Sequence, residues 1–302
     1  MHYEIKDSSV TMTIDGQYAG KPLSFLADRL FLNSRTVNRK LQERAILLNG
    51  TPVRDISEVL PKHSTLMIRL EKQSPDWPPS QTPCTIVYRN AFLAAVHKDA
   101  GRIIHEEGFG TECLNADMAA RLLMEEIPAP VRPLHRLDRE TEGLVLYSLI
   151  PLFQPWFDNA LAEHRIQRTY LALTKGICTP GKTMTIHKSI GKDRHVNGKY
   201  RVSATGKNAL TEAECIASVN GYSLFRCQLG TGRTHQIRVH LADAGYPIVN
   251  DPLYGVHTRT VQGMGLWACE VTVRDPLSGG KHRIRDPLAP EWYRQFTHMT
   301  EQ

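Results

Sequence analysis

Residues 135–149 read HRLDRETEGLVLYSL and join a charged cluster directly to a nearly continuous apolar run. The apolar run is typical of a strand that is buried on both faces. A charged loop that leads into such a rigid strand can hold a catalytic side chain firmly. Arg136 and Arg139 lie close to Asp138 in this loop and favour an ionised carboxylate, which can serve as a nucleophile or a base. Taken alone, the cluster is also compatible with an ordinary charged surface loop.

A second polar cluster, GTGRTHQIRVH, spans residues 230–240. Its two glycines permit close backbone approach, and Arg233 and Arg238 supply planar guanidinium groups that bind anions. The pattern predicts an arginine-rich turn that opens a helix. His235 and His240 are five residues apart, which is a poor spacing for a helical metal site. The cluster also lacks the Gly-Lys-Ser/Thr ending of a phosphate-binding loop.

A third element, RTYLAL, begins at Arg168 and places Tyr170 in a predicted strand. A tyrosine in a strand more often packs in the core, with its hydroxyl at an edge, than takes part in chemistry. Around these clusters the patterns predict strands at 85–88, 93–97, 143–149, 169–174, 211–219 and 222–229 and a helix at 115–126. Strands and helices do not alternate regularly, so we predict an α+β domain with a mixed, mostly antiparallel sheet.

The clearest break in the chain is residues 73–83, QSPDWPPSQTP, whose four prolines favour extended backbone. We interpret it as a linker between a small unit, 1–72, and a larger unit, 84–302. In the small unit, apolar residues from Leu23 onward recur at helical spacing, and Ser34 is predicted to cap a second helix. We also predict for this unit a helix at 35–44, strands at 46–48 and 66–70, and a hairpin turn at Asn49-Gly50.

Arg35, Arg39 and Lys40 give the second predicted helix a basic face that can meet phosphates, although a solvated helix face is the simpler interpretation. The stretch SRTVNRKLQERAILLNGTPV, residues 34–53, resembles the S4 RNA-binding module. It departs from that pattern at Lys62-His63, where a Gly-Asp pair is usual. The resemblance implies an S4-like α/β module that binds RNA through this helix.

The composition is compatible with RNA binding but does not require it. Among 302 residues, 37 Lys and Arg outweigh 31 Asp and Glu, a net charge of +6 that permits a polyanionic partner. Hydrophobic residues make up 41%, enough for a sizeable core. The N-terminal MHYEIKDSSV lacks the pattern of a secretory signal, and no apolar run approaches a membrane span. The six cysteines form no C-x-x-C pair, so we expect reduced thiols in a cytoplasmic protein.

Taken together, the motifs resemble the RluA-type family of pseudouridine synthases. The family signature HRLDxxTSG stands here as HRLDRETEG, and GRTHQIRVH at 232–240 matches without a change. GKNALTEAE at 206–214 and AGYPIVNDPLYG at 244–255 also fit the family, in the expected order. Glu142 replaces the usual serine of the first signature, so we expect altered substrate choice or loop geometry there.

The resemblance implies the pseudouridine synthase fold and an enzyme that isomerises specific uridines in structured RNA. It places the catalytic aspartate at Asp138, the active-site tyrosine at Tyr170 and the arginine partner of the aspartate at Arg238. Arg136 is expected to fill the space left by the flipped base. The further residues assigned to RNA contact are His135, Arg233 and His235. No metal or organic cofactor, no membrane and no small-molecule partner are expected, and we expect a monomer.

Several alternatives stay open at this level. The S4-like module favours large-subunit ribosomal RNA over transfer RNA, which the same family also modifies. A non-catalytic RNA-binding protein would have no reason to keep Asp138, Tyr170 and Arg238 together. A glycosidase could pair Asp138 with Glu140 or Glu142, but those carboxylates lie on one short segment rather than across a sugar. Whether Asp138 attacks the substrate or removes the C2′ proton is not decided by sequence.

Overall fold

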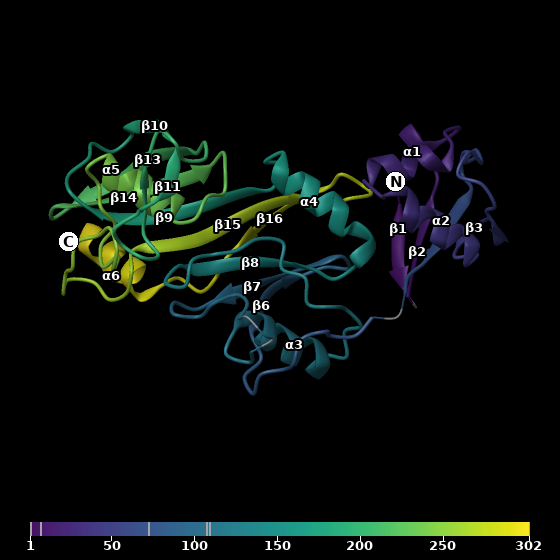
Figure 1. Ribbon diagram of the computed structural model, residues 1–302, viewed down its shortest axis with the longest axis horizontal. Coiled ribbons are helices and arrows are strands. Elements are labelled where there is room, and N and C mark those ends of the chain that lie inside the picture. Colours follow the sequence, from purple (N-terminus) through teal and green to yellow (C-terminus); the bar gives the residue numbers. More distant parts are fainter. Residues whose placement is uncertain (1, 7, 72, 107, 109, 302) are drawn as a thin grey trace.

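The computed structural model describes residues 2–6, 8–71, 73–106, 108 and 110–301. The described chain forms a small N-terminal lobe beside a larger domain built on one long, twisted sheet (Figure 1). The small lobe contains β1 (Tyr3–Lys6), β2 (Ser9–Thr13), η1 (Gly16–Tyr18), α1 (Leu23–Arg29), α2 (Ser34–Gln42), β3 (Ile46–Leu48), β4 (Thr51–Pro52) and β5 (Thr65–Arg69). Its strands pair in the order β1-β2-β5-β3-β4.

The larger domain has the strand order β10-β13-β14-β9-β15-β8-β7-β6, and β16 pairs with β15. Its first elements are β6 (Thr85–Arg89), β7 (Leu93–Lys98), α3 (Leu114–Met124), β8 (Glu142–Ser148), η2 (Pro151–Phe153), α4 (Gln154–Ala162), β9 (Gln167–Lys175) and β10 (Thr183–His187). The later ones are β11 (Ile190–Lys192), β12 (Tyr200–Val202), β13 (Leu210–Val219), β14 (Tyr222–Leu229), α5 (Gln236–Asp243), β15 (Leu266–Arg274), β16 (Lys281–Arg285) and α6 (Glu291–Thr300). β11 and β12 form a separate hairpin.

Among the described strands, β8 and β15 form the one parallel pair of the large sheet, and its other pairs are antiparallel. The predicted α+β class and mixed, mostly antiparallel sheet are therefore confirmed. The predicted strand at 222–229 coincides with β14, and the predicted strand at 143–149 coincides with β8 to within one residue at each end. A continuous apolar run predicts such strands well because both of their faces are covered.

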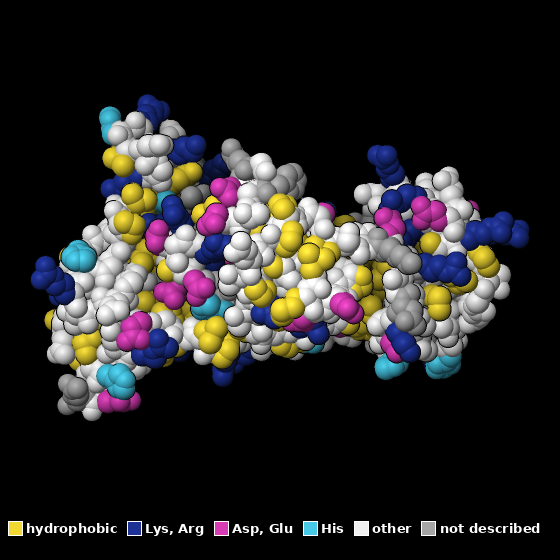
Figure 2. Space-filling model, turned by 90° about the horizontal axis from the view of Figure 1, so that it is seen from below, with side chains coloured by type: hydrophobic (Ala, Val, Ile, Leu, Met, Phe, Trp, Pro, Cys, Tyr) yellow, Lys and Arg dark blue, Asp and Glu magenta, His cyan; other side chains and the backbone are white. Residues whose placement is uncertain are grey.

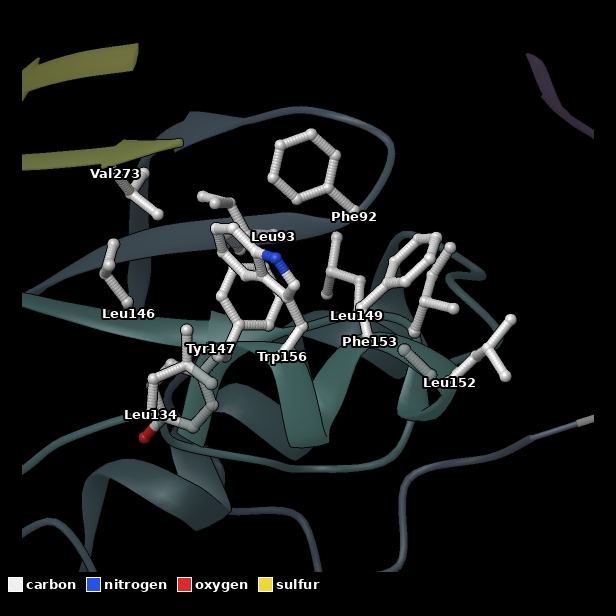
Figure 3. Close-up of a cluster of buried hydrophobic side chains, with 14 of the residues drawn as sticks. Phe92, Leu93, Leu134, Leu146, Tyr147, Leu149, Leu152, Phe153, Trp156 and Val273 are labelled. Atoms are coloured by element: carbon white, nitrogen blue, oxygen red, sulfur yellow. The ribbon is translucent and has the colours of Figure 1, made fainter. Parts of the chain in front are cut away.

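The core of the larger domain lies where α4 and the β7–β8 pair meet. All six residues of β7 are buried, and Phe92 stacks on Phe157 of α4 with ring centroids 6.1 Å apart. Figure 3 shows this cluster, to which Trp156 of α4, Leu93 of β7 and Tyr147 of β8 all belong. The buried Tyr147 hydroxyl donates to Asn115 Oδ1 of α3 at 2.9 Å, so its polar end is satisfied inside the core. This packing makes β8 a fixed support for the loop that precedes it.

The N-terminal lobe packs directly on the larger domain. One buried apolar cluster contains Leu26 of α1 and Leu30, its C-cap residue, together with Leu152 and Phe153 of η2. The Tyr3 hydroxyl of β1 also donates to the carboxylate of Asp275, beyond the end of β15. Because the shared contacts are apolar and buried, they fix the orientation of the lobe more firmly than a covalent linker alone does.

The proline-rich segment predicted to be a linker lies against the larger domain. Trp77 Nε1 donates to the Gly110 carbonyl at 3.0 Å. The Asp76 carboxylate accepts the Val131 N–H at 3.0 Å and pairs with Arg132 at 2.6 Å. The segment is extended, as its prolines require, but it is held at these points along its path.

In the small lobe one local prediction was wrong and one hairpin was missed. Ser34 is the first residue of α2, and Asn33 is its N-cap, with Oδ1 accepting the Thr36 N–H at 2.8 Å. Asn and Ser are equally good caps, so the sequence did not separate these adjacent candidates. The hairpin of β1 and β2 was not predicted, because its short strands are rich in Ser, Thr and charged residues.

The close approach of β8 to β15 depends on Gly143, which has φ +115°. A Cβ at this position would lie 2.4 Å from the Ala268 carbonyl oxygen. We predict that Gly143→Ala lowers the free energy of unfolding by about 3 kcal/mol or more, because backbone strain and the steric clash both destabilise the folded state. Gly181→Ala is the matched control, because Gly181 has φ +86° and a Cβ added there would meet no atom within 4 Å. Equal urea midpoints for the two variants would contradict the expected clash.

Candidate active site

A cavity of about 810 Å³ opens where the loop before β8 meets the start of α5. Asp138 in the loop and Arg238 in α5 lie 100 residues apart in sequence. In the structure Arg238 Nη1 donates to Asp138 Oδ2 at 3.1 Å. The Arg238 side chain is 3% exposed and that of Asp138 is 22% exposed. The ion pair therefore has a buried guanidinium and a carboxylate that is accessible from the cavity.

Asp251 is a second carboxylate partner of Arg238, to which the sequence analysis assigned no role. Arg238 Nε donates to Asp251 Oδ2 at 2.7 Å and Nη2 donates to Oδ1 at 2.9 Å. Oδ1 also accepts the backbone N–H groups of Leu253 and Tyr254 at 2.9 and 3.2 Å. A bidentate pair of this kind fixes the plane of the guanidinium. Asp251 is part of the motif AGYPIVNDPLYG, which could have marked it as a candidate, but no local pattern indicates which distant residue this aspartate contacts.

Tyr170 lies on β9 and lines the same cavity as Asp138. Its side chain is buried, and burial raises the pKa of its hydroxyl; the charge of Arg168 opposes this rise and that of Asp138 adds to it. The phenol is therefore neutral at physiological pH. A neutral aromatic ring in the cavity wall offers a flat apolar face on which a planar base can stack.

Lys98 anchors the loop that carries Asp138, another role that the sequence analysis did not assign. Its fully buried Nζ donates to the carbonyl oxygens of Asp99, Arg102 and Arg139 at 2.8 to 2.9 Å. Burial lowers the pKa of Lys98 to about 8, against the opposing charges of nearby carboxylates. Because Arg139 directly follows Asp138, this contact restrains the backbone next to the carboxylate.

The other residues assigned to RNA contact in the two motifs occupy different environments. Arg136 and Arg233 are exposed at the cavity. His235 is half-buried in the cavity wall. His135 is buried, its Nε2 accepts the Leu146 N–H at 3.3 Å, and burial lowers its pKa to about 3. His135 is thus a neutral group that supports β8, and the structure does not favour it as a charged contact to phosphate.

The predicted basic face of α2 is only partly exposed. Arg35 and Arg39 face solvent, and Arg39 pairs with Glu71. Lys40 is 5% exposed and its Nζ donates to the Arg69 carbonyl at 2.9 Å, so it ties α2 to β5 rather than facing a ligand. On the face shown in Figure 2, basic side chains are spread over the N-terminal lobe and interspersed with acidic ones. None of these α2 residues lines the cavity of Asp138.

The described residues contain neither a candidate metal site nor a candidate membrane-spanning helix. No group of three or more His, Cys, Asp or Glu side chains within the described part of the chain is arranged to hold a metal ion. No helix in residues 2–301, apart from the undescribed positions, has the length and apolarity needed to cross a membrane.

Comparisons with known proteins identify the family of this chain. The model of the family described as RNA pseudouridylate synthase matches residues 93–243. The uncharacterized RNA pseudouridine synthase YlyB of Bacillus subtilis is 29% identical over 84% of this chain and 86% of its own. Ribosomal large subunit pseudouridine synthase D of Neisseria meningitidis is 30% identical over 82% of this chain and 67% of its own.

Solved structures show the same fold. Human RNA pseudouridylate synthase domain containing 4 aligns with a TM-score of 0.58 and 20% identity, over 71% of this chain and 92% of its own. Human RNA pseudouridylate synthase domain containing 1 aligns with a TM-score of 0.57 and 21% identity, over 74% and 98% respectively. Fold and family model together place the protein among the isomerases that modify RNA. The chain belongs to the RluA-type family of RNA pseudouridine synthases.

The two-carboxylate arrangement around Arg238 leads to a prediction for Asp251. Asp251→Asn keeps the shape of the side chain but removes the charge that fixes the guanidinium. Since small displacements of a catalytic group cost about 100-fold in rate, we expect kcat to fall by about 10- to 100-fold with little change in KM. Asp243→Asn is the matched control, because Asp243 ends the same helix in an exposed pair with Lys188. An unchanged kcat in Asp251→Asn, measured by pseudouridine formation, would show that Arg238 needs no second carboxylate.

Proposed function

We propose that this RNA pseudouridine synthase acts on specific uridines of large-subunit ribosomal RNA, with Asp138 as the catalytic carboxylate. The observation that carries the proposal is the cavity in which the accessible Asp138 carboxylate is ion-paired to the buried Arg238. Tyr170 lines the wall of the same cavity. These groups match, residue by residue, the catalytic set that the family motifs imply.

The reaction replaces the N1–C1′ bond of a uridine with a C5–C1′ bond. The base must detach, rotate and rejoin the same sugar, so the protein has to hold it throughout. A uridine within structured RNA must first leave its stack, at a cost of a few kcal/mol. The cavity of about 810 Å³ is large enough to receive a nucleotide in this flipped state.

Each residue then has a distinct task. Asp138 meets the sugar or base with an ionised oxygen, because Arg238 offers it a charge-assisted hydrogen bond. Tyr170 stacks on the uracil ring. The exposed guanidinium of Arg136 fills the gap that the flipped base leaves in the RNA. No redox step is involved, because the substrate and product are isomers.

Ribosomal RNA is the target that the comparisons favour. The Neisseria relative is described as acting on the large ribosomal subunit. The N-terminal lobe, which the sequence likens to an S4 module, would add contacts to an extended, folded RNA through Arg35 and Arg39. Transfer RNA is the second candidate, since the same motifs serve both classes of RNA.

Tritium release from RNA that carries [5-³H]uridine tests the proposal, because C5 loses its hydrogen when it bonds to C1′. We expect the wild type to release tritium from ribosomal RNA and Asp138→Asn to release none above background, with transfer RNA as the parallel substrate. Release by Asp138→Asn at the wild-type rate would remove the catalytic role of Asp138. Release from transfer RNA alone would replace the proposed substrate with the second candidate.

Salt dependence tests the contribution of α2. Each phosphate contact that is lost lowers the slope of log K against log salt by about 1. We expect Arg35→Ala with Arg39→Ala to reduce the slope by about 1 to 2 and to weaken binding to the ribosomal fragment.

Arg294→Ala is the control, because it removes an exposed arginine from α6 at the opposite end of the molecule (Figure 1). A slope in the double variant equal to that of this control would show that α2 makes no phosphate contact.

A further inference from the structure

The hydroxyl of Tyr254 joins the β11–β12 hairpin to the wall of the catalytic cavity. Its oxygen accepts the backbone N–H of Tyr200 at 2.7 Å and lies 2.9 Å from Nδ1 of His235. The Tyr254 ring also lies over the guanidinium of Arg238, 5.2 Å from the ring centroid to Cζ. One side chain therefore touches the hairpin, the half-buried histidine and the arginine that pairs with Asp138.

The donor pattern of this hydroxyl defines the tautomer of His235. The Tyr200 amide can only donate, so one lone pair of the phenol oxygen is occupied. Burial raises the pKa of Tyr254 to about 12, so the phenol keeps its proton. Among the described residues, Nδ1 of His235 is the acceptor within reach of that proton. Nδ1 is then unprotonated, and the imidazole carries its proton on Nε2.

His235 is held in one orientation by its backbone and by two aromatic rings. It is the N-cap residue of α5, with left-handed backbone dihedrals (φ +55°), and its side chain makes no capping hydrogen bond to the helix. The rings of Tyr200 and Tyr254 meet its imidazole edge-on, with centroids 5.5 and 5.6 Å away. Its Nε2 has no hydrogen-bond partner in the described part of the chain, and His235 lines the cavity with Asp138.

The charged groups around His235 are Asp138, Arg238 and Asp251. Burial lowers the pKa of His235, and Arg238 adds to this, while the two carboxylates oppose it. The ammonium group of Lys199 lies over the Tyr254 ring, and as a positive charge it does not favour protonation of His235. The imidazole is therefore neutral at physiological pH and offers a single donor.

We propose that His235 donates a hydrogen bond from neutral Nε2 to an acceptor oxygen of the flipped nucleotide, and that Tyr254 is the positioning residue that selects this tautomer. The proposal rests on the proposed function, because it assumes that a uridine enters this cavity. A donor fixed before the substrate arrives avoids the cost of ordering it during binding. Without the Tyr254 hydroxyl, neutral His235 can place its proton on Nδ1. Its unprotonated Nε2 would then face the acceptor oxygen of the nucleotide and could not donate a hydrogen bond to it.

Imidazole ¹⁵N NMR of the full, RNA-free chain tests the tautomer directly. The spectrum of His235→Gln identifies the His235 signals by their absence. We expect the wild type to show the Nε2–H tautomer at about pH 8 and Tyr254→Phe, which keeps the ring over Arg238, to show a mixture of both tautomers. A wild-type Nδ1–H tautomer, or a Tyr254→Phe spectrum unchanged from the wild type, would overturn the proposal.

RNA binding supplies a second readout that a purely structural role would not produce. At about pH 8 we expect Tyr254→Phe to raise the Kd for substrate RNA by about threefold to tenfold, the range of one neutral hydrogen bond. Below the pKa of His235 in this variant, which the same ¹⁵N spectra give when recorded against pH, the defect should disappear, because a protonated imidazole carries Nε2–H whichever tautomer it had. His235→Gln, which keeps a donor near Nε2, should bind more tightly than His235→Leu.

A Tyr254→Phe defect that stays the same above and below the measured pKa of His235 would contradict the tautomer mechanism and indicate lost packing instead. These two measurements need no turnover. A wild type that binds RNA but releases no tritium from either RNA would therefore contradict the proposed function while the tautomer and the binding signature are still judged on their own results.

Discussion

A guanidinium that is 3% exposed cannot stay in a protein interior without carboxylate partners, and the site is arranged around this requirement at Arg238. Asp251 supplies a bidentate, fully buried partner, and Asp138 supplies a single contact from the cavity side. The difference between the two contacts matters. The bidentate pair fixes the arginine, and the arginine then holds the accessible carboxylate in place. Breaking such a buried pair on one side typically costs about 3–5 kcal/mol, so stability and geometry are tied together here.

The sheet brings the partners of this ion pair to one place. Asp138 precedes β8 and Arg238 lies in the helix after β14, strands that the fold separates by β9 and β15. Gly143 lets β8 approach β15 closely, and Lys98 ties the backbone after Asp138 to the end of β7. The backbone that follows Asp138 is therefore held at two points, and the Asp138 side chain lines the cavity beside it. Rigid support of this kind is what lets a short loop present a reactive group in one geometry.

The N-terminal lobe and the β11–β12 hairpin are both joined to this frame. The lobe shares a buried apolar cluster with η2, so it is oriented relative to the cavity rather than loosely tethered. The hairpin reaches the cavity wall through Tyr200 and Tyr254.

The sequence by itself determined the class of fold, the family and the identity of Asp138, Tyr170 and Arg238. It could do so because apolar runs report strands buried on both faces, and because the motifs HRLD and GRTHQIRVH are long and ordered. Local patterns could not show that Lys40 and His135 are buried, since the same letters are compatible with an exposed helix face or a loop.

The tertiary structure alone decided the roles of Asp251, Tyr254 and Lys98. Each acts through a partner at least 13 residues away or through several carbonyl groups from different segments. Burial and hydrogen-bond partnership depend on which distant surfaces come together, and periodicity along a chain carries no information about them. The residues proposed to carry out chemistry were therefore visible in the sequence, whereas the residues that hold them in place became visible only in the folded molecule.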